Sequence, residues 1–302
     1  MNDLAPGLVA NLLMTAAISF GAQLVLWLVS MRTKDATAAD WWWGLGYGTI
    51  AVFTYFNTAG VGVESRKLLI VACTVIWGVR LSAHLVMRSK ADQWRELDRY
   101  EKYRVDARKA GVNVNAYVYR KVFGIQGLMM WLVSLPVQVT QFYLRPTQLG
   151  TIAIVGALLW LVGFSIEAVT DRQLARFKAD PSNKGKLLDA GLWRYTRHPN
   201  YFGEALLWWG IFLIACDNWI GVFTIVSPLR MHYRMAYRWG IGWLEEKMSS
   251  QKPAYRDYVA RTNRFYPWFP RGSASPPSGS PRQPAAAAPA KPSGPGAWPP
   301  SG

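Results

Sequence analysis

The chain is poor in charged residues and in the residue types that build metal or disulfide sites. Only 17% of its 302 residues are charged, below the quarter that is usual in soluble domains. Acidic residues are especially scarce, with 18 Asp and Glu against 34 Lys and Arg. Two cysteines and three histidines provide neither a disulfide framework nor a zinc cluster. A small soluble domain stabilised by disulfides or structural zinc is therefore excluded, and we expect no metal site.

Long apolar runs take the place of the missing charge. Apolar residues make up 51% of the chain, and several runs exceed the roughly 18 residues that indicate a membrane-spanning helix. Seven spans are expected, of which the second is short and rich in glycine. They cover residues 8–30, 43–56, 68–87, 122–144, 149–169, 202–215 and 219–231. The sequence thus predicts an all-α, multi-pass integral membrane protein, in the endoplasmic reticulum of a eukaryote or the inner membrane of a bacterium.

Basic residues gather in three regions that are separated by loops with almost none. Residues 88–121, 172–200 and 230–271 hold ten, seven and nine Lys and Arg, which is 26 of the 34. Cytoplasmic loops of membrane proteins carry such an excess of positive charge. With seven spans, this places the N-terminus outside and the C-terminus in the cytosol. A nucleic-acid-binding protein would gather these charges on one soluble face, so the expected partners are the lipid bilayer and a hydrophobic small molecule, with no nucleic acid.

The composition changes sharply at residue 272. From there onward the chain consists almost entirely of Ser, Pro, Ala and Gly, a composition that cannot bury a hydrophobic core. We therefore expect one integral membrane domain over residues 1–271 and a disordered tail over residues 272–302. Residues 91–120 are charged, and we expect them to be helical at the membrane surface.

One stretch places Arg, His, Asn and Glu directly before an apolar span. It reads Gly-Leu-Trp-Arg-Tyr-Thr-Arg-His-Pro-Asn-Tyr-Phe-Gly-Glu from Gly191 to Glu204. The proline suits the first turn of a helix, so Asn200 and Glu204 project from that turn beside free N–H groups that suit anions. Polar groups at this depth are costly unless they bind something. The alternative is an interfacial anchor, in which Trp193 and Tyr195 lie among lipid headgroups.

Other polar side chains lie inside or at the edge of the expected spans. Arg80 and His84 are four residues apart and share a helix face, and ionisable groups inside a membrane are functional candidates by default. The alternative for His84 is that it reaches out to the headgroups. Arg80 needs a buried partner, which Asp40 or Glu167 could supply. Asp40 also enters a glycine-rich helix that permits close helix contact, while the adjoining Trp41–Trp43 run is typical of an interfacial belt.

The Gly191–Glu204 stretch resembles the C-terminal signature of the steroid 5α-reductase family, in its branch of proteins of unknown function (DUF1295). It is similar, more distantly, to the sterol C14- and C7-reductases and the isoprenylcysteine carboxyl methyltransferases. The resemblance covers nearly the whole chain. Its further matches are Ala39-Asp40-Trp41-x-x-Gly44-Leu45-Gly46, Ile76-Trp77-Gly78-Val79-Arg80-Leu81, Asp171–Lys178, Glu245-Glu246 and Tyr255-x-x-Tyr258.

The resemblance implies a seven-helix membrane fold whose cytosolic half, about residues 165–271, binds NADPH. Basic side chains and helix N-termini neutralise the phosphates of such a cofactor, while amide and carboxylate groups bond its carboxamide and ribose. The cofactor-binding candidates are Asp171, Lys178, Trp193, Tyr195, Arg197, His198, Asn200, Glu204, Glu246, Tyr255 and Tyr258.

The substrate half of the family pattern is matched less well. The family's Gln-Glu pair is missing from the second span, and Trp77 stands where the family has a tyrosine that engages the substrate carbonyl. A steroid substrate is therefore not implied. The candidates for the proton donor are Tyr201, His84 and Tyr55. The polar residues with a substrate-binding or structural role are Asp40, Trp77, Arg80 and Glu167.

These observations favour a membrane-embedded, NADPH-dependent reductase of a carbon–carbon double bond in a hydrophobic lipid, sterol-like or isoprenoid. Hydride would pass to the β-carbon while a proton donor stabilises the developing enolate. The alternative is an S-adenosylmethionine-dependent lipid or isoprenylcysteine-type methyltransferase, which shares the Arg-His-Pro-x-Tyr-x-Gly pattern and a later Glu-Glu pair. Asn200 and the Asp171–Lys178 segment favour the reductase. A non-catalytic membrane scaffold is a third alternative, which the polar groups inside the spans disfavour.

Overall fold

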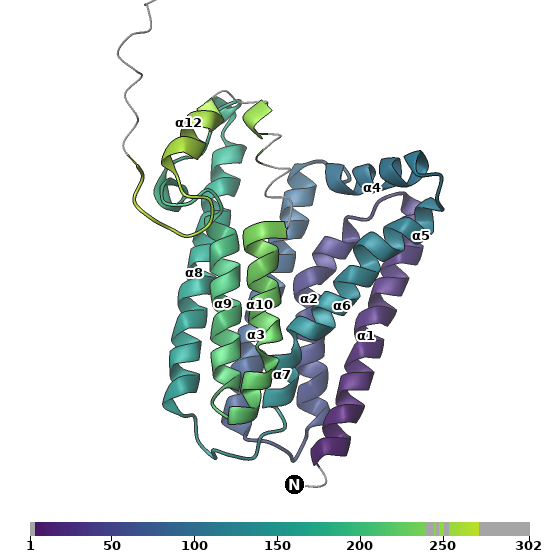
Figure 1. Cartoon of the computed structure of the whole chain (residues 1–302), viewed down its shortest axis with the longest axis vertical. Helices are drawn as coiled ribbons and strands as arrows, with labels where there is room; N and C mark the ends of the chain where they lie inside the picture. Colours follow the sequence, from purple (N-terminus) through teal and green to yellow (C-terminus); the bar gives the residue numbers. More distant parts are fainter. Residues whose placement is uncertain (1–3, 239–244, 246–247, 251–253, 272–302) are drawn as a thin grey trace, which may run out of the picture. The chain divides into compact units, whose positions relative to one another are not determined.

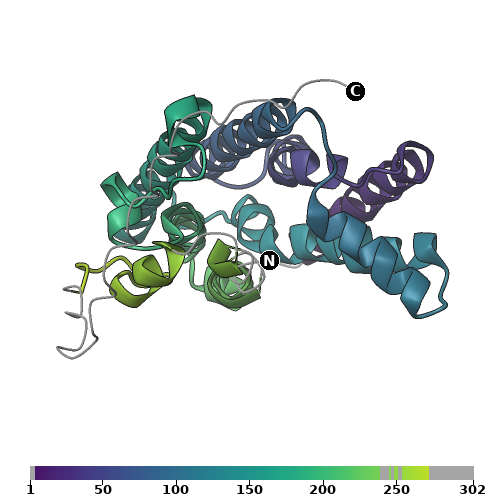
Figure 2. The same ribbon diagram turned by 90° about the horizontal axis from the view of Figure 1, so that it is seen from above.

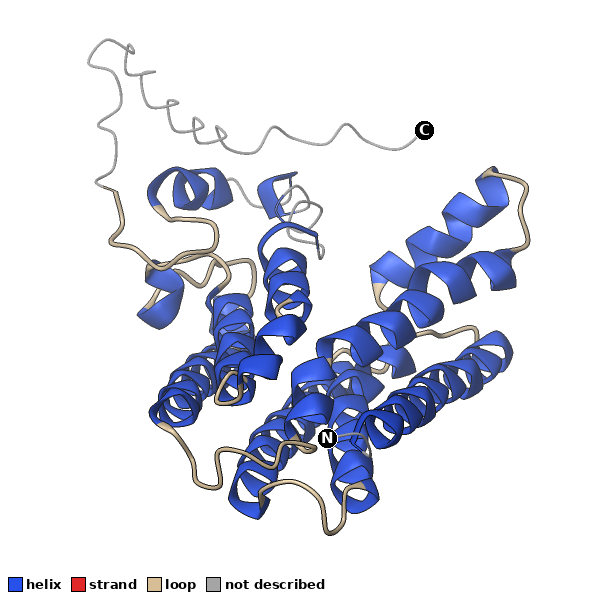
Figure 3. Cartoon of the chain, turned by 60° about the horizontal axis from the view of Figure 1, so that its bottom comes forward, coloured by secondary structure: helices blue, strands red, loops and turns tan. Residues whose placement is uncertain are grey.

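The computed structural model describes residues 4–238, 245, 248–250 and 254–271, and within these ranges it contains helices, turns and loops but no strand (Figures 1 and 3). The α-helices are α1 (Leu4–Thr33), α2 (Ala38–Asn57), α3 (Glu64–Ala91), α4 (Asp98–Lys109), α5 (Val114–Val118), α6 (Ile125–Val133), α7 (Leu135–Thr140), α8 (Thr151–Ala179), α9 (Pro199–Ala215), α10 (Val226–Tyr233) and α12 (Ala254–Arg261). Shorter 3₁₀ or π-helical turns cover Tyr119–Gly124, Pro181–Asn183, Gly191–Arg194, Trp219–Thr224 and Arg234–Arg238.

The all-α, multi-pass membrane architecture is confirmed. Within the described residues, four helical segments are long and apolar enough to cross a membrane, namely Gly7–Thr33, Glu64–Ala91, Val114–Thr140 and Thr151–Ala179. The remaining expected spans correspond to the shorter helices α2, α9 and α10. The count of seven spans and the outside position of the N-terminus stay predictions.

Two boundaries differ from the sequence prediction. The second span was expected from residue 43, but α2 begins at Ala38, because the tryptophan run forms part of the helix instead of preceding it. The last span was expected as one helix over 219–231, but a 3₁₀ turn, Trp219–Thr224, precedes α10. The expected turn at Asp217–Asn218 is present. There Asp217 forms a buried ion pair with Arg66 at 3.1 Å.

Glycines bring pairs of helices into backbone contact. A Cβ added to Gly163 on α8 would lie 2.5 Å from the backbone nitrogen of Leu207 on α9. A Cβ added to Gly203 on α9 would lie 2.7 Å from the carbonyl oxygen of Gly163. The same holds for α2 and α3, where a Cβ on Gly44 would lie 2.3 Å from the carbonyl oxygen of Gly78. Small residues allow such close packing of membrane helices. The close contact predicted for the glycine-rich second span is therefore confirmed.

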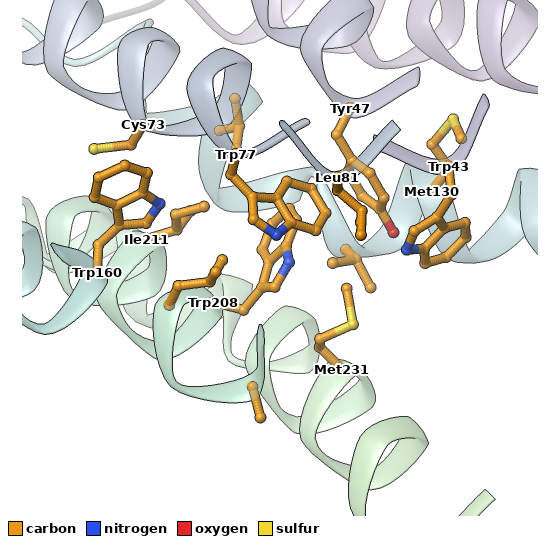
Figure 4. Close-up of a cluster of buried hydrophobic side chains, with 14 of the residues drawn as sticks. Trp43, Tyr47, Cys73, Trp77, Leu81, Met130, Trp160, Trp208, Ile211 and Met231 are labelled. Atoms are coloured by element: carbon orange, nitrogen blue, oxygen red, sulfur yellow. The ribbon is translucent and has the colours of Figure 1, made fainter. Parts of the chain in front are cut away.

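An aromatic cluster joins α2, α3 and α9 at the centre of this bundle (Figure 4). The rings of Tyr47 and Trp208 are 4.9 Å apart, those of Trp77 and Trp208 are 5.2 Å apart, and those of Trp43 and Tyr47 are 5.1 Å apart. Edge-to-face and tilted contacts of this kind add to the stability that a core gains from burying apolar area. The cluster forms the apolar wall beside the polar side chains described next.

Candidate functional site

Four polar side chains from three helices meet inside the bundle, and we call them the interior polar cluster: Arg80, Glu167, Asp171 and Asn200. Arg80 on α3 pairs with Glu167 on α8 and also donates to Asp171 at 2.8 Å. Asn200 on α9 donates its amide N–H to Asp171 at 3.2 Å. The indole nitrogen of Trp77 donates to the second oxygen of Glu167 at 3.1 Å. Glu167 is thus the expected partner of Arg80.

Each of the three helices contributes two polar residues that are four apart. These pairs are Arg80 and His84 on α3, Glu167 and Asp171 on α8, and Asn200 and Glu204 on α9. Residues at this spacing lie on the same face of a helix, so each helix turns one polar stripe inward. The Nε2 atom of His84 lies 3.7 Å from Asp171. This repeated spacing is visible in the sequence, where the α3 and α9 pairs were singled out but the α8 pair was not.

Glu204 lies one turn deeper and borders residues that the sequence analysis missed. Its Oε1 atom, the hydroxyl of Tyr47 and the indole nitrogen of Trp208 are all buried and have no hydrogen-bond partner among the described residues. Arg234 lies within electrostatic reach of Glu204, and its guanidinium is 3.8 Å from the ring centre of Trp43. The polar cluster therefore continues into the aromatic cluster at Glu204.

Asp40 lies outside this cluster, which corrects its expected pairing with Arg80. It pairs instead with Arg99 and accepts a hydrogen bond of 2.6 Å from the hydroxyl of Tyr100, both on α4. Burial raises the pKa of Tyr100 well above its usual range, so the hydroxyl stays a donor at neutral pH. Asp40 thus fastens the charged surface helix α4 to the start of α2. The helix expected within residues 91–120 is confirmed by α4 and α5, and its position at the membrane surface stays a prediction.

The Arg-His pair of the signature contacts the C-terminal segment. Arg197 donates to Glu245 at 2.8 Å and to the carbonyl oxygen of Thr262 at 2.6 Å, and His198 Nε2 lies 3.2 Å from the same Glu245 oxygen. We call Arg197, His198 and Glu245 the C-terminal clasp. Burial raises the pKa of Glu245, but the hydrogen bonds from His198 and Arg197 outweigh it and lower the pKa to about 2. Burial in turn lowers the pKa of His198.

The remaining aromatic candidates also hold this segment. The hydroxyl of Tyr258 donates to the carbonyl oxygen of Trp193, whose indole nitrogen donates to the carbonyl oxygen of Thr170 at 3.3 Å. Tyr195 accepts a hydrogen bond of 3.0 Å from the backbone of Trp268. Tyr255 is buried beside Tyr258, and this burial raises the pKa of Tyr255 to about 12.

The other candidates are dispersed. Tyr201 stacks on His198 with a ring separation of 5.6 Å, and Lys178 lies exposed in the last turn of α8, within electrostatic reach of His84. Tyr55, in the last turn of α2, donates a hydrogen bond to Glu64 at the start of α3. The structure therefore does not bring Tyr55 to the interior polar cluster. Glu246 and the tail over residues 272–302 lie outside the described residues. Within the described residues, no group of three or more His, Cys, Asp and Glu is placed to hold a metal ion.

Comparison with known proteins identifies a family match over most of the chain. Residues 26–262 match the family described as protein of unknown function (DUF1295). An uncharacterised protein of Schizosaccharomyces pombe is 27% identical over 273 residues, which cover 83% of this chain and 78% of that protein. The steroid 5-alpha-reductase DET2 of Arabidopsis thaliana is 27% identical over 110 residues, 35% of this chain and 41% of that protein. No solved structure matches.

Proposed function

The chain belongs to the DUF1295 family of proteins of unknown function, and from this premise we propose that it is a membrane-embedded, NADPH-dependent reductase of a carbon–carbon double bond in a hydrophobic lipid. One observation carries the proposal. Asn200 and Glu204, one turn apart at the start of α9, each keep a buried oxygen without a partner among the described residues, beside an apolar aromatic wall. The distant similarity to a steroid 5-alpha-reductase supports the same chemistry.

The residues around Asn200 fit a dinucleotide. The free Oδ1 atom of Asn200 suits the amide N–H groups of a nicotinamide carboxamide, because an unpaired buried acceptor is costly and gains from a donor. Arg88 and Lys178 both lie within electrostatic reach of His84 and form a positive rim at the ends of α3 and α8. Such cations neutralise phosphate groups. When bound, NADPH supplies the hydride.

Tyr47 is our preferred proton donor. Its side chain is wholly buried, its hydroxyl has no partner among the described residues, and Glu204 and Arg234 lie within electrostatic reach of it. A phenol held between tryptophan rings can donate to the oxygen of a polarised carbonyl in a site without water. The alternatives to Tyr47 are His84, whose Nε2 atom lies 3.7 Å from Asp171, and Tyr201, which follows Asn200 in the chain.

Ligand-dependent thermal stability tests the cofactor. The protein, purified in detergent, is heated with NADPH, NADH or S-adenosylmethionine, since a ligand that binds the native state raises the melting temperature. We expect NADPH to raise it most, with a smaller rise or none for NADH. A rise with S-adenosylmethionine alone would identify a methyltransferase instead. The absence of any rise with NADPH would contradict the proposal.

A further inference from the structure

One face of α1 carries a row of buried polar side chains. Asn11, Thr15, Ser19 and Gln23 follow one another at intervals of four residues, and each is at most 1% exposed. The other faces of α1 are apolar and largely exposed, as at Leu13. Figures 1 and 2 place α1 at the edge of the bundle opposite α8. The row therefore lies apart from the interior polar cluster, facing α2, α6 and α7.

The first half of this row is fully engaged with its neighbours. The Oε1 atom of Gln138 accepts from Asn11 at 3.3 Å and from Thr15 at 2.6 Å, while its amide nitrogen donates to Ser134 at 2.8 Å. Asn11 also donates to Thr54 at 3.2 Å. These bonds between helices have an evident structural role, because polar side chains hold membrane helices together.

The second half of the row is different. Gln23 and Gln126 are 0% and 1% exposed, yet neither amide has a partner for its oxygen or its nitrogen among the described residues. Both residues belong to the packed pair of helices α1 and α6, where Ser19, one turn before Gln23, donates to the carbonyl oxygen of Gly127, the residue after Gln126, at 2.8 Å. A Cβ added to Gly127 would lie 3.5 Å from Cγ of Gln23.

A third group without a partner borders this contact. The indole nitrogen of Trp42 on α2 also lacks a partner among the described residues. Trp42 and Met130 meet at Gly46, where an added Cβ would lie 2.9 Å from that nitrogen and 2.3 Å from the Met130 sulfur. Met130 follows Gln126 by one helical turn. Two amides and an indole N–H, none of them charged, are thus left unsatisfied where α1, α2 and α6 meet.

We propose that Gln23 and Gln126 bind the hydroxyl or carbonyl group of an uncharged membrane lipid between α1 and α6. An amide offers both donors and an acceptor, which suits a group that can accept, donate or do both. A carboxylate or phosphate headgroup would bring a charge that no group of this site neutralises, so charged lipids are excluded. Phe20 packs on Gly127 and is itself 36% exposed, so the site borders the surrounding lipid. The inference does not depend on the proposed reductase activity.

The test is to extract the protein with its surrounding lipid into polymer-bounded nanodiscs and to identify the retained lipids by mass spectrometry. We expect one class of uncharged lipid with a hydroxyl or ketone group to be enriched over the total membrane lipid of the same cells. In Gln23→Met and Gln126→Met we expect this enrichment to fall roughly tenfold. Both variants should fold, because methionine has a similar length and no polar group to satisfy.

Two matched variants separate lipid binding from helix packing. Gln138→Met removes a glutamine that is fully bonded, so it should lower the melting temperature and keep the enriched lipid. Gly21→Ala, with no atom within 4 Å of the added Cβ, should keep the enriched lipid and should not lower the melting temperature. Three outcomes would overturn the proposal: no enriched uncharged class in the wild type, enrichment in both Gln→Met variants that equals the wild-type enrichment, or enrichment of charged lipids alone.

Discussion

Asn200 on α9 donates a hydrogen bond of 3.2 Å to Asp171 on α8, and the other oxygen of this carboxylate accepts from Arg80 on α3 at 2.8 Å. One carboxylate therefore joins α8 and α9 to α3, whose Arg80 lies 91 residues before Asp171 in the chain. Breaking a buried charged pair leaves an uncompensated charge. The effect of an Asp171 substitution on ligand binding therefore cannot be separated from its effect on folding. Substitutions of its neighbours are more informative.

Removing the Asn200 amide or the Lys178 cation should weaken NADPH binding. We expect Asn200→Ala and Lys178→Ala each to raise the dissociation constant by roughly tenfold, the equivalent of one charge-assisted or amide hydrogen bond. Binding is measured by titration of the purified variants. Asn115→Ala, at an exposed position of α5, is the matched control and should bind as the wild type does. An unchanged constant in both site variants would remove these residues from the cofactor site.

Adding a methyl group at the contact between α8 and α9 should destabilise the protein. The Cβ of Gly203→Ala would lie 2.7 Å from two backbone atoms, the Glu167 nitrogen and the Gly163 oxygen, so the helices must separate. Overpacking of this kind costs about 1–3 kcal/mol. We expect a lower melting temperature for Gly203→Ala and Gly163→Ala. Gly21→Ala should have no effect or stabilise slightly, since alanine favours helix. Equal melting temperatures in all three variants would mean that the contact is looser than described.

Acid should loosen the C-terminal clasp in two stages. Burial holds the pKa of His198 below its usual value of 6.5, so the unfolded chain takes up the proton first and stability falls as pH drops below about 6.5. Glu245, with a pKa of about 2 against the usual 4.5, contributes stability above pH 4.5 that is lost on further acidification. Melting temperature measured against pH should therefore fall in both windows, and His198→Gln should remove the first. If the His198→Gln curve matched the wild type, the clasp would not control acid stability.

Opposite ends of α9 should lie on opposite sides of the membrane. At 17 residues, α9 extends roughly 25 Å, close to the thickness of a bilayer core. The basic regions place Lys184 in the cytosol and Asn218 outside, with the N-terminus outside. Single cysteines at these two positions, in a chain whose Cys73 and Cys216 are replaced by serine, should react with an impermeant reagent from opposite sides. Labelling of both from one side would reject the seven-span topology.

The tail should be dispensable and the segment before it should not. Phe265 is buried and its carbonyl accepts from Thr196 at 2.9 Å, so truncation before Phe265 should lower both the melting temperature and NADPH affinity. Truncation after Arg271 should leave both nearly unchanged, because residues 272–302 have no apolar periodicity to offset their ordering entropy. Loss of binding on removal of residues 272–302 alone would place the domain boundary elsewhere.

The sequence predicted the polar faces of helices better than the depth of individual groups. The four-residue spacing of Arg80 and His84 correctly indicated one inward face, and Glu167 was among the expected partners. Tyr55 was named as a candidate proton donor on α2, and Tyr47 was not considered. Eight residues separate them, roughly 12 Å along the helix, and the sequence alone does not show which turn faces Glu204.

Asp40 and the clasp residues show a second limit of sequence reasoning. The partner of Asp40 is Arg99, on a surface helix 59 residues later, and nothing in the local pattern of α2 indicates that contact. Arg197 and His198 have the side chains that bind a phosphate or a carboxylate, and here the carboxylate belongs to Glu245 of the same chain. Hydrogen-bonding residues look alike in a sequence whether they hold a ligand or another segment.

The backbone contact between α8 and α9 limits which parts of the protein can move. Because Gly163 and Gly203 bring the two backbones into direct contact, we expect α8 and α9 to move as one rigid unit. We therefore expect Asp171 and Asn200 to keep their spacing when a ligand binds. Admission of a bulky ligand has to displace other helices. Attempts to broaden substrate choice should accordingly leave Gly163 and Gly203 unchanged and alter side chains on the other helices.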